Sequence, residues 1–269
     1  MTVHFIGAGP GAADLLTVRA VRLLASSPVC VYAGTYLDAE VLSHCPPDAT
    51  LIDSAGLSLD EITAHLVAAH AAGKDVARLC SGDPSLYSAL AEQARRLDRA
   101  GVPWDVTPGV PAYAAAAAVL GRELTVPELA QTVILTRTQA ASTAMPESES
   151  LERLAATGST LVLHLGIRRT RELAERLAGF YGPDCPAAVV SRATQPDELV
   201  LRGTLADIGE QVETAGLRQA AVIIVGPALA AEGFADSHLY GTRIARRQEE
   251  ATTPLPTGES RKSTRALLT

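Results

Sequence analysis

Three short segments of this 269-residue chain combine glycine and proline in the way that ligand-binding loops do. They are residues 7–11 (Gly-Ala-Gly-Pro-Gly), 81–84 (Ser-Gly-Asp-Pro) and 108–110 (Pro-Gly-Val), and each follows a short run that is typical of a strand. Glycine has no Cβ atom, so a ligand can approach the backbone closely at these points. Parallel strands would bring the three loops to one edge of a sheet, which is where α/β folds bind ligands. Backbone groups, the Asp83 carboxylate and small side chains would then line one cleft, which suits a ligand that carries a positive charge or hydroxyl groups and no phosphate.

The first loop also fits the Gly-x-Gly-x-x-[Gly/Ala] pattern of dinucleotide-binding folds. That pattern expects an acidic residue at the end of the second strand, but residues 32–35 read Tyr-Ala-Gly-Thr and Asp38 comes several residues late. Pro10 lacks the main-chain amide that a pyrophosphate would use. A P-loop is excluded, because no Gly-Lys-[Ser/Thr] follows. NAD or FAD binding is therefore disfavoured but open, and the loop taken alone is equally consistent with a structural turn.

Strands and helices alternate along the whole chain, which predicts an α/β fold with a parallel or mixed sheet in each half. Ser58 and Glu61 match a capping box that begins a helix ending near residue 72. The alanine-rich helix at 112–120 presents little bulk, which would suit either a ligand or a closely packed sheet. Further helices are expected at 15–24, 86–100, 151–156, 170–181 and 205–214. Strands are expected at 3–6, 29–32, 51–52, 75–80, 104–107, 132–136, 160–165, 187–191, 198–203 (a hairpin partner of 187–191) and 221–226.

Length favours two domains. We place the boundary in the connector that starts at residue 122, which gives an N-terminal α/β domain at 1–121 and a C-terminal α/β domain at 122–240. Residues 138–150 are small and polar, as in a mobile loop. Residues 241–269 are polar and predicted to be disordered.

Composition excludes several classes of function. A net charge of −7 argues against nucleic acid or an anionic membrane as a partner, and aromatic residues make up only 4% of the chain. The four Cys and six His show no metal-ligand spacing, so no metal site is expected and the thiols are predicted to be free in a reducing cytosol. The chain begins directly with a strand and has no long apolar run, so we expect no signal peptide, no membrane span and a cytoplasmic location.

The three loops, together with Asp14-Leu15-Leu16-Thr17 after the first, resemble those of the tetrapyrrole methylases, which are S-adenosylmethionine-dependent enzymes of cobalamin and sirohaem synthesis. The matching segments occur in the same order as in the family, and they span residues 3–228. Residues 31–34, 54–61 and above all 123–137 are similar to one branch of the family that acts on a precorrin. The loop at 138–145 departs from the pattern, because some relatives carry Gly-Arg-Thr there.

The resemblance implies two α/β domains with S-adenosylmethionine folded into the cleft between them, a tetrapyrrole (precorrin) substrate and a homodimer. The sulfonium already activates the methyl group, so the protein would supply alignment and no nucleophile. Carried over by motif, the cofactor contacts fall on Pro10, Gly82, Asp83, Leu86, Tyr87, Pro111, Ala112, Leu165, Ala193, Thr194 and Ala221.

Asp83 is the expected cofactor-orienting carboxylate; the alternative is that it caps the following helix, and it could do both. Tyr87 either faces the cleft or packs in the core. A tetrapyrrole carries many carboxylates, so guanidinium groups should meet it, and Arg137, Arg168 and Arg192 are the candidates because they follow strands. Arg169 and Arg171 are expected on a solvated helix face.

Three other interpretations stay open. One is a sibling methylase that acts at another ring carbon, on uroporphyrinogen III or on a substrate that already holds cobalt. The second is a flavin or nicotinamide oxidoreductase. The third is a non-catalytic binding module.

Overall fold

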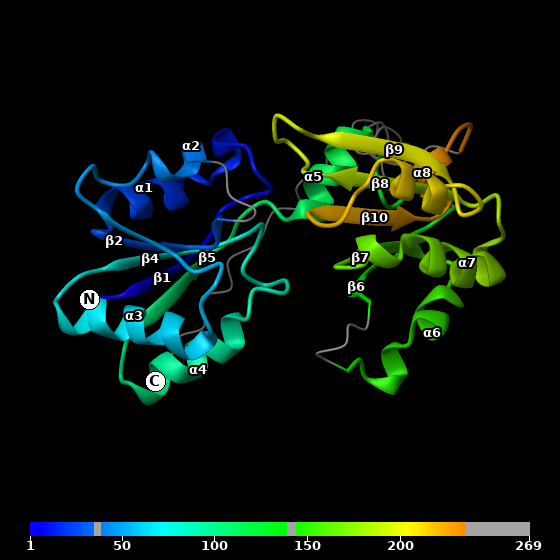
Figure 1. Ribbon diagram of the computed structural model, residues 1–269. Coiled ribbons are helices and arrows are strands. Elements are labelled where there is room, and N and C mark those ends of the chain that lie inside the picture. The colour runs from blue at the N-terminus through cyan, green and yellow to red at the C-terminus, as the bar shows by residue number, and fades with distance from the viewer. Residues whose placement is uncertain (35–38, 139–143, 235–269) are drawn as a thin grey trace, which may run out of the picture. The chain divides into compact units, whose positions relative to one another are not determined.

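A computed structural model describes residues 1–34, 39–138 and 144–234. Residues 1–231 form one compact unit that contains two five-stranded sheets (Figure 1). The remainder of the chain is a separate unit, and the predicted disordered tail lies outside the described residues. Among the described helices, none is both long and apolar enough to cross a membrane.

The first sheet is parallel, with strand order β3-β2-β4-β1-β5. Phe5 and Ile6 in its central strand β1 are fully buried, as expected for a strand covered on both faces. One face packs on α1 and α2, and the other packs on α3 and α4. The strands are β1 Val3–Gly7, β2 Val29–Tyr32, β3 Thr50–Asp53, β4 Val76–Cys80 and β5 Trp104–Thr107. The helices are η1 Ala13–Leu15, α1 Val18–Ser26, α2 Ala39–Leu42, α3 Leu59–Ala71 and α4 Leu90–Arg99.

Because β4, β1 and β5 are parallel neighbours, the three glycine-containing loops meet at their carboxyl ends, as the sequence predicts. The three loops approach one another so closely that their backbone atoms leave no room for side chains at two glycines. A Cβ atom on Gly7 would lie 2.4 Å from the Gly109 nitrogen, and one on Gly109 would lie 2.3 Å from the Gly82 oxygen. Real Cβ atoms do not come this close to backbone, so both positions require glycine.

The second sheet is mixed, with order β6-β7-β10-β8-β9; only β6 and β7 pair in parallel. Helices α6, α7 and α8 contribute to the core on one face, and the alanine-rich α5 packs on the other. The predicted hairpin is the β8–β9 pair. The strands are β6 Val133–Arg137, β7 Thr160–His164, β8 Pro186–Ser191, β9 Leu199–Thr204 and β10 Ala221–Val225. The helices are α5 Ala112–Leu120, η3 Glu147–Glu149, α6 Leu151–Ala155, η4 Ile167–Arg169, α7 Thr170–Tyr181, α8 Ile208–Thr214 and η5 Pro227–Ala230.

The capping box is confirmed: the Ser58 amide donates to Glu61 Oε2 at 2.8 Å, and the Glu61 amide donates to Ser58 Oγ at 3.3 Å. The helix predicted at 86–100 starts at Leu90 instead, because Tyr87 and Ala89 have positive φ and cannot continue a helical turn. The helix predicted at 15–24 starts at Val18, where Thr17 Oγ1 accepts a hydrogen bond from the Ala20 amide at 3.1 Å.

The predicted helix at 205–214 starts at Ile208, because a turn precedes it in which Asp207 accepts from the Thr204 amide. Strand β7 ends at His164, one residue early, since Leu165 has positive φ. The domain boundary at residue 122 stays a prediction. The predicted mobile loop at 138–150 lies partly outside the described residues, and it includes η3.

Candidate functional site

A cavity of about 740 Å³ opens at the carboxyl ends of the first sheet and is also lined by the second half of the chain. Its volume lies within the usual range for small-molecule sites. We call the lining residues before residue 113 the first wall and those after it the second wall. The first wall contains Pro10, Ser81, Gly82, Asp83, Leu86, Tyr87, Pro111 and Ala112. The second wall contains Thr138, His164, Leu165, Gly166, Ile167, Arg168, Arg169, Val190, Arg192, Ala193, Gln195, Arg218, Gln219, Ala220, Ala221 and Val222.

The structure therefore gathers ten of the eleven residues predicted from the sequence as cofactor contacts around one cavity. Thr194 is the exception, since it is not among the lining residues. Its Oγ1 atom instead accepts a hydrogen bond from the Ala12 amide at 3.1 Å. Thr194 thus fixes the first glycine loop against the second half of the chain.

Gln195 completes this link, and its role was not predicted from the sequence. Its Nε2 atom donates to the Pro10 carbonyl at 3.1 Å. A Cβ atom on Gly11 would lie 2.3 Å from the Gln195 Cγ atom, so the absence of a side chain at residue 11 makes room for the glutamine. No local pattern marks a residue that acts on a loop 185 positions away.

Asp83 joins two of the glycine-containing loops. Its Oδ1 atom accepts hydrogen bonds from the Ser85 amide and hydroxyl, and its Oδ2 atom accepts from the Gly109 amide at 2.9 Å. Burial opposes ionisation, but these hydrogen bonds outweigh it and hold the pKa of Asp83 below its ordinary value. The side chain is therefore an anion in the first wall. The alternative that it caps α4 is wrong, because the N-cap residue of that helix is Ala89.

Backbone strain concentrates at the cavity. Seven non-glycine residues of the described chain have positive φ, and four of them line the cavity: Tyr87, Leu165, Arg192 and Ala220. Each such residue costs about 1 kcal/mol or more and persists where the surrounding structure enforces it, often at a functional site. Tyr87 is 46% exposed, so the alternative that it packs in the core is wrong.

The second wall is rich in guanidinium groups. Arg168, Arg169, Arg192 and Arg218 line it, and Asp83 is the only acidic residue among the described lining residues. The Arg168 Nε atom donates to the Arg218 carbonyl at 3.0 Å, and Arg192 forms an ion pair with Asp197 at 3.3 Å. The cavity therefore has an anion in one wall and an excess of cations in the other.

The three predicted substrate arginines do not all lie at this cavity. Arg168 and Arg192 line it, whereas Arg137 lines a second cavity of about 410 Å³ together with Arg169 and Arg176. The Arg137 guanidinium donates to the carbonyls of Thr138 and Ala144. Of the two arginines expected on a solvated helix face, Arg171 is exposed and paired with Glu213, and Arg169 is partly exposed and paired with Glu172 but also borders both cavities.

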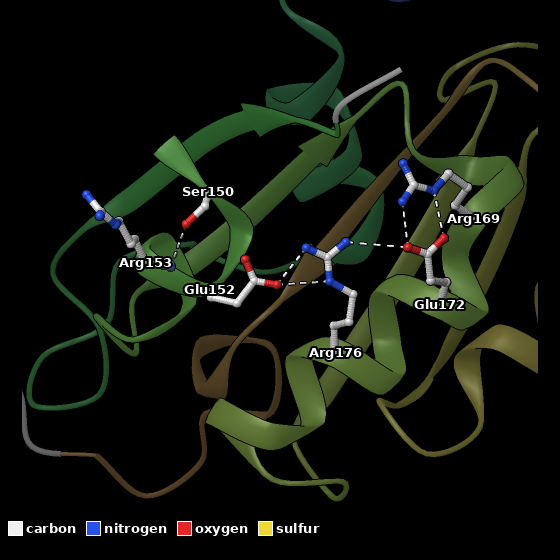
Figure 2. A network of polar contacts seen from close by, with 6 residues as sticks. All are labelled: Ser150, Glu152, Arg153, Arg169, Glu172 and Arg176. Carbon is white, nitrogen blue, oxygen red and sulfur yellow. Dashed lines mark hydrogen bonds and ion pairs between the residues drawn. The ribbon is translucent and has the colours of Figure 1, made fainter. Parts of the chain in front are cut away.

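Arg169 is oriented by the chain of ion pairs drawn in Figure 2. Its Nε atom donates to Glu172 Oε2 at 2.8 Å, and Glu172 also accepts from Arg176 at 3.4 Å. Arg176 in turn donates to Glu152 from its Nε atom at 3.0 Å. The Glu172 carboxylate raises the pKa of Arg169, so its guanidinium stays charged. The network links η4, α7 and α6 and fixes a cation at the border between the two cavities.

His164 also lines the cavity and was not singled out from the sequence. It is the last residue of β7, and its ring centroid lies 5.5 Å from that of Tyr87. Burial lowers the pKa of His164, so the imidazole is neutral at neutral pH. Its Nε2 atom is buried, and within the described chain it has no hydrogen-bond partner.

Within the described residues, no three His, Cys, Asp or Glu side chains come close enough to hold a metal ion. The four cysteines are free thiols; Cys30, Cys80 and Cys185 are buried and Cys45 is half-buried.

Comparisons with known proteins agree on one family. The sequence model for the Tetrapyrrole (Corrin/Porphyrin) Methylases matches residues 2–209. A precorrin-4 C(11)-methyltransferase from Rhodococcus erythropolis is 62% identical over 240 residues, which cover 89% of this chain and 96% of the relative. The structure of a cobalt precorrin-4 methyltransferase superposes with a TM-score of 0.82 and 37% identity, covering 85% of this chain and 95% of the other. A uroporphyrin-III C-methyltransferase from Thermus thermophilus, solved with S-adenosylhomocysteine, gives a TM-score of 0.72 and 30% identity over 86% of this chain and 99% of the other.

Proposed function

This chain belongs to the tetrapyrrole methylase family, and we propose that it transfers the methyl group of S-adenosylmethionine to carbon 11 of precorrin-4, giving precorrin-5 in corrin-ring synthesis. The observation that carries the proposal is the charge division of the cavity. A carboxylate in the first wall suits a cationic cofactor, and the arginines of the second wall suit a polycarboxylate substrate. The 62% identity to the Rhodococcus relative favours precorrin-4 over the other tetrapyrroles.

The residues of the first wall fit S-adenosylmethionine. The cavity floor is made by loops in which glycine brings backbone to the surface, and the Asp83 anion faces a cofactor that carries net positive charge on its sulfonium and amino groups. Bound there, S-adenosylmethionine supplies a methyl group that is already activated for transfer. We propose that Pro10, Gly82, Pro111 and Ala112 hold it by shape, and that Asp83 orients it.

The proposed cofactor contacts from the second wall are Leu165, Ala193 and Ala221, with Thr194 acting through the Ala12 amide. Leu86 and Leu165 present apolar surface to the cavity. Tyr87 covers one side of this space. We assign no nucleophile, because alignment of an activated methyl group with the acceptor carbon can account for several kcal/mol of barrier.

We propose that the substrate carboxylates bind the second wall at Arg168, Arg192, Arg169 and Arg218. Guanidinium pairs with carboxylates through parallel hydrogen bonds, so an array of arginines fixes both the position and the orientation of a flat polyanion. Arg137 would serve a carboxylate that reaches the second cavity. The resemblance to the family further suggests a homodimer, a cytoplasmic location and the division into domains at 1–121 and 122–240.

The test is to incubate the purified protein with precorrin-4 and methyl-labelled S-adenosylmethionine. We expect one labelled methyl group per product, located at carbon 11 by NMR. Parallel reactions with cobalt-precorrin-4 and with uroporphyrinogen III address the sibling activities. Methylation of uroporphyrinogen III without methylation of precorrin-4 would overturn the substrate assignment.

Ligand binding separates the proposal from the other two classes of function. We expect S-adenosylhomocysteine to raise the thermal unfolding temperature, since a ligand that binds only the native state stabilises it. Stabilisation by NAD but not by S-adenosylhomocysteine would instead support an oxidoreductase. Cofactor binding without turnover of any tetrapyrrole would support a binding module.

A further inference from the structure

One turn of the chain touches both groups of residues that we assign to ligands. It joins β8 to β9 and spans residues 192–198, and we call it the crossing turn. Its Gln195 Nε2 atom donates to the carbonyl of Pro10, which lines the first wall, at 3.1 Å. The same turn carries Arg192, which lines the second wall. The crossing turn therefore contacts a proposed cofactor residue and contains a proposed substrate residue.

The place of Gln195 against the first glycine loop is a fitted one. A Cβ atom on Gly11 would lie 2.3 Å from the Gln195 Cγ atom, so the loop leaves space for the glutamine there. Gly11 does not have positive φ, so a left-handed backbone is not the reason for this glycine. Thr194 of the crossing turn adds a second bond, in which its Oγ1 atom accepts from the Ala12 amide at 3.1 Å. The loop and the turn are thus complementary in both shape and hydrogen bonding.

The first glycine loop is also fixed on its other side, to the loop that carries Asp83. Gly9 and Gly82 exchange two backbone hydrogen bonds, at 3.2 and 2.8 Å. A continuous series of contacts therefore runs from Gly82 through Gly9 and Pro10 to Gln195. A ligand that orders the first wall also orders the crossing turn.

The crossing turn is braced internally, so this order extends to Arg192. The Gln195 amide donates to the Arg192 carbonyl at 3.0 Å, and the Arg192 guanidinium pairs with Asp197 at 3.3 Å. The Thr194 amide donates to Glu198 Oε2 at 2.6 Å. Arg192 and Thr194 both have positive φ, a conformation that persists where the surroundings enforce it. A shift of Gln195 therefore changes the position of Arg192 as well.

A stiff link between two binding sites has a thermodynamic consequence. A ligand that orders the link lowers the entropy cost of binding the second ligand, so each of the two raises the affinity for the other. The effect is reciprocal, because the coupling free energy belongs to the pair of ligands. The crossing turn is therefore placed to make cofactor and substrate bind cooperatively.

We propose that Gln195 is a positioning residue that couples the two ligand sites: it holds the crossing turn against Pro10, so that bound S-adenosylmethionine fixes Arg192 for the tetrapyrrole. The inference rests on the proposed function, and it assigns Gln195 no contact with the reacting atoms. It makes the order of the substrate site depend on the occupancy of the cofactor site.

The experiment measures the affinity of the full chain for S-adenosylhomocysteine twice by calorimetry, without precorrin-4 and with saturating precorrin-4 under anaerobic conditions. S-adenosylhomocysteine has no methyl group to donate, so the ternary complex does not react. The dissociation constant without precorrin-4, divided by the constant with it, is the coupling factor.

Two variants disturb the contact from its two sides, and a third is the control. Gln195→Met keeps the length of the side chain but removes the donor, and Gly11→Ala adds a Cβ atom that displaces Gln195. The control is Gln211→Met. Gln211 Nε2 also donates to a backbone carbonyl, that of Arg202 at 3.2 Å, but Gln211 does not line the cavity.

For the wild-type chain we expect a coupling factor of about five or more. Gln195→Met should lower the affinity for S-adenosylhomocysteine alone by at most about tenfold, the effect of one hydrogen bond, and should bring the coupling factor close to one. Gly11→Ala should do the same, and combining the two substitutions should add little, because both act on one contact. Gln211→Met should keep the wild-type coupling factor.

A wild-type coupling factor of one would overturn the inference. So would a Gln195→Met protein whose affinity falls by the same factor with and without precorrin-4, because that pattern indicates a purely structural glutamine. The wild-type measurement needs no variant, so a folding defect does not block the test. Failure of the wild-type chain to bind S-adenosylhomocysteine or precorrin-4 would overturn the proposed function itself, whereas binding of both without coupling would overturn the inference alone.

Discussion

The two walls of the cavity are built by different means. The first wall exposes the backbone of Gly82 and one carboxylate, and the loops that form it approach closely because Gly7 and Gly109 behind it have no Cβ atom. The second wall presents long side chains, among them four arginines, on turns that include non-glycine residues with positive φ. Backbone geometry tolerates almost no substitution, whereas long side chains can be exchanged for others. The backbone loops and Asp83 of the first wall suit the cofactor, and the arginines of the second wall suit the substrate carboxylates, while Leu165, Ala193 and Ala221 of the second wall also face the proposed cofactor site.

The largest expected effect is on the loops that support the first wall. Gly109→Val would place its side chain against backbone atoms of Gly82 and Gly7, which cannot move aside. We expect a loss of about 3 kcal/mol or more in the free energy of unfolding, measured by denaturant titration, together with loss of S-adenosylhomocysteine binding. The matched control is Gly179→Ala in α7, where nothing lies within 4 Å of the new Cβ atom and a gain of about 0.5–1 kcal/mol is expected. A Gly109→Val protein of normal stability and affinity would refute the description of this wall.

Asp83→Asn tests the charge of the first wall. Removing the anion should lower the affinity for S-adenosylmethionine, which is cationic at sulfur, about tenfold more than it lowers the affinity for S-adenosylhomocysteine. Because the pKa of Asp83 is lowered, the side chain is fully ionised above the ordinary carboxyl pKa of about 3.9. The preference for the cationic ligand is therefore complete in that range, and it is lost only as the pH falls through the lowered pKa of Asp83. Affinities measured from pH 4 to 8 should therefore show a constant ratio between the two ligands in the wild type. Equal weakening of the two ligands would assign Asp83 a purely structural role.

Arg192→Gln addresses the second wall. If that wall binds the substrate, the KM for precorrin-4 should rise by roughly tenfold while the affinity for S-adenosylhomocysteine stays unchanged, since one charge-assisted hydrogen bond is lost. Steady-state kinetics and calorimetry measure the two quantities. Arg171→Gln is the control, because Arg171 pairs with Glu213 on the surface and does not line the main cavity. Weaker cofactor binding in Arg192→Gln would break the division between the walls.

The smallest effect is expected from Glu172→Gln, which weakens the network that orients Arg169. An exposed ion pair is worth about 0.2–1 kcal/mol, so stability should hardly change. We expect a KM for precorrin-4 that rises two- to five-fold, at constant kcat, because a less ordered cation still attracts the substrate. An unchanged KM would leave Arg169 outside the substrate site.

The contrast between a backbone wall and a side-chain wall also explains which parts of the site could be predicted from the sequence. The first wall is encoded in short motifs at strand ends, so the meeting of its three loops followed from the expectation of a parallel sheet, and the assignment of Pro10, Gly82 and Asp83 to one site followed from the resemblance of these motifs to the family. The predicted start of α4, at residue 86, lies four residues before the observed start at Leu90, because the left-handed turn at Tyr87 contains no glycine that would mark it in the sequence.

The second wall depends on contacts between distant segments, which local patterns do not record. Gln195 acts on the Pro10 carbonyl, and Arg169 owes its orientation to Glu172 and hence to α6. His164 reads in the sequence as one more residue of an apolar strand. The absence of a hydrogen-bond partner for its buried Nε2 atom within the described chain is a property of the folded surroundings and not of the residue.

Helix α5 joins the two walls: its N-terminal residues Pro111 and Ala112 belong to the first, and its body packs on the second sheet. Alanine has no side-chain rotamers, so the contact of Ala115 and Ala116 with the sheet has no torsional freedom with which to adjust. Helix α5 is therefore held rigidly against the second sheet. A movement of the first wall relative to the second would therefore be taken up in the segment that joins β5 to this helix, at 108–111.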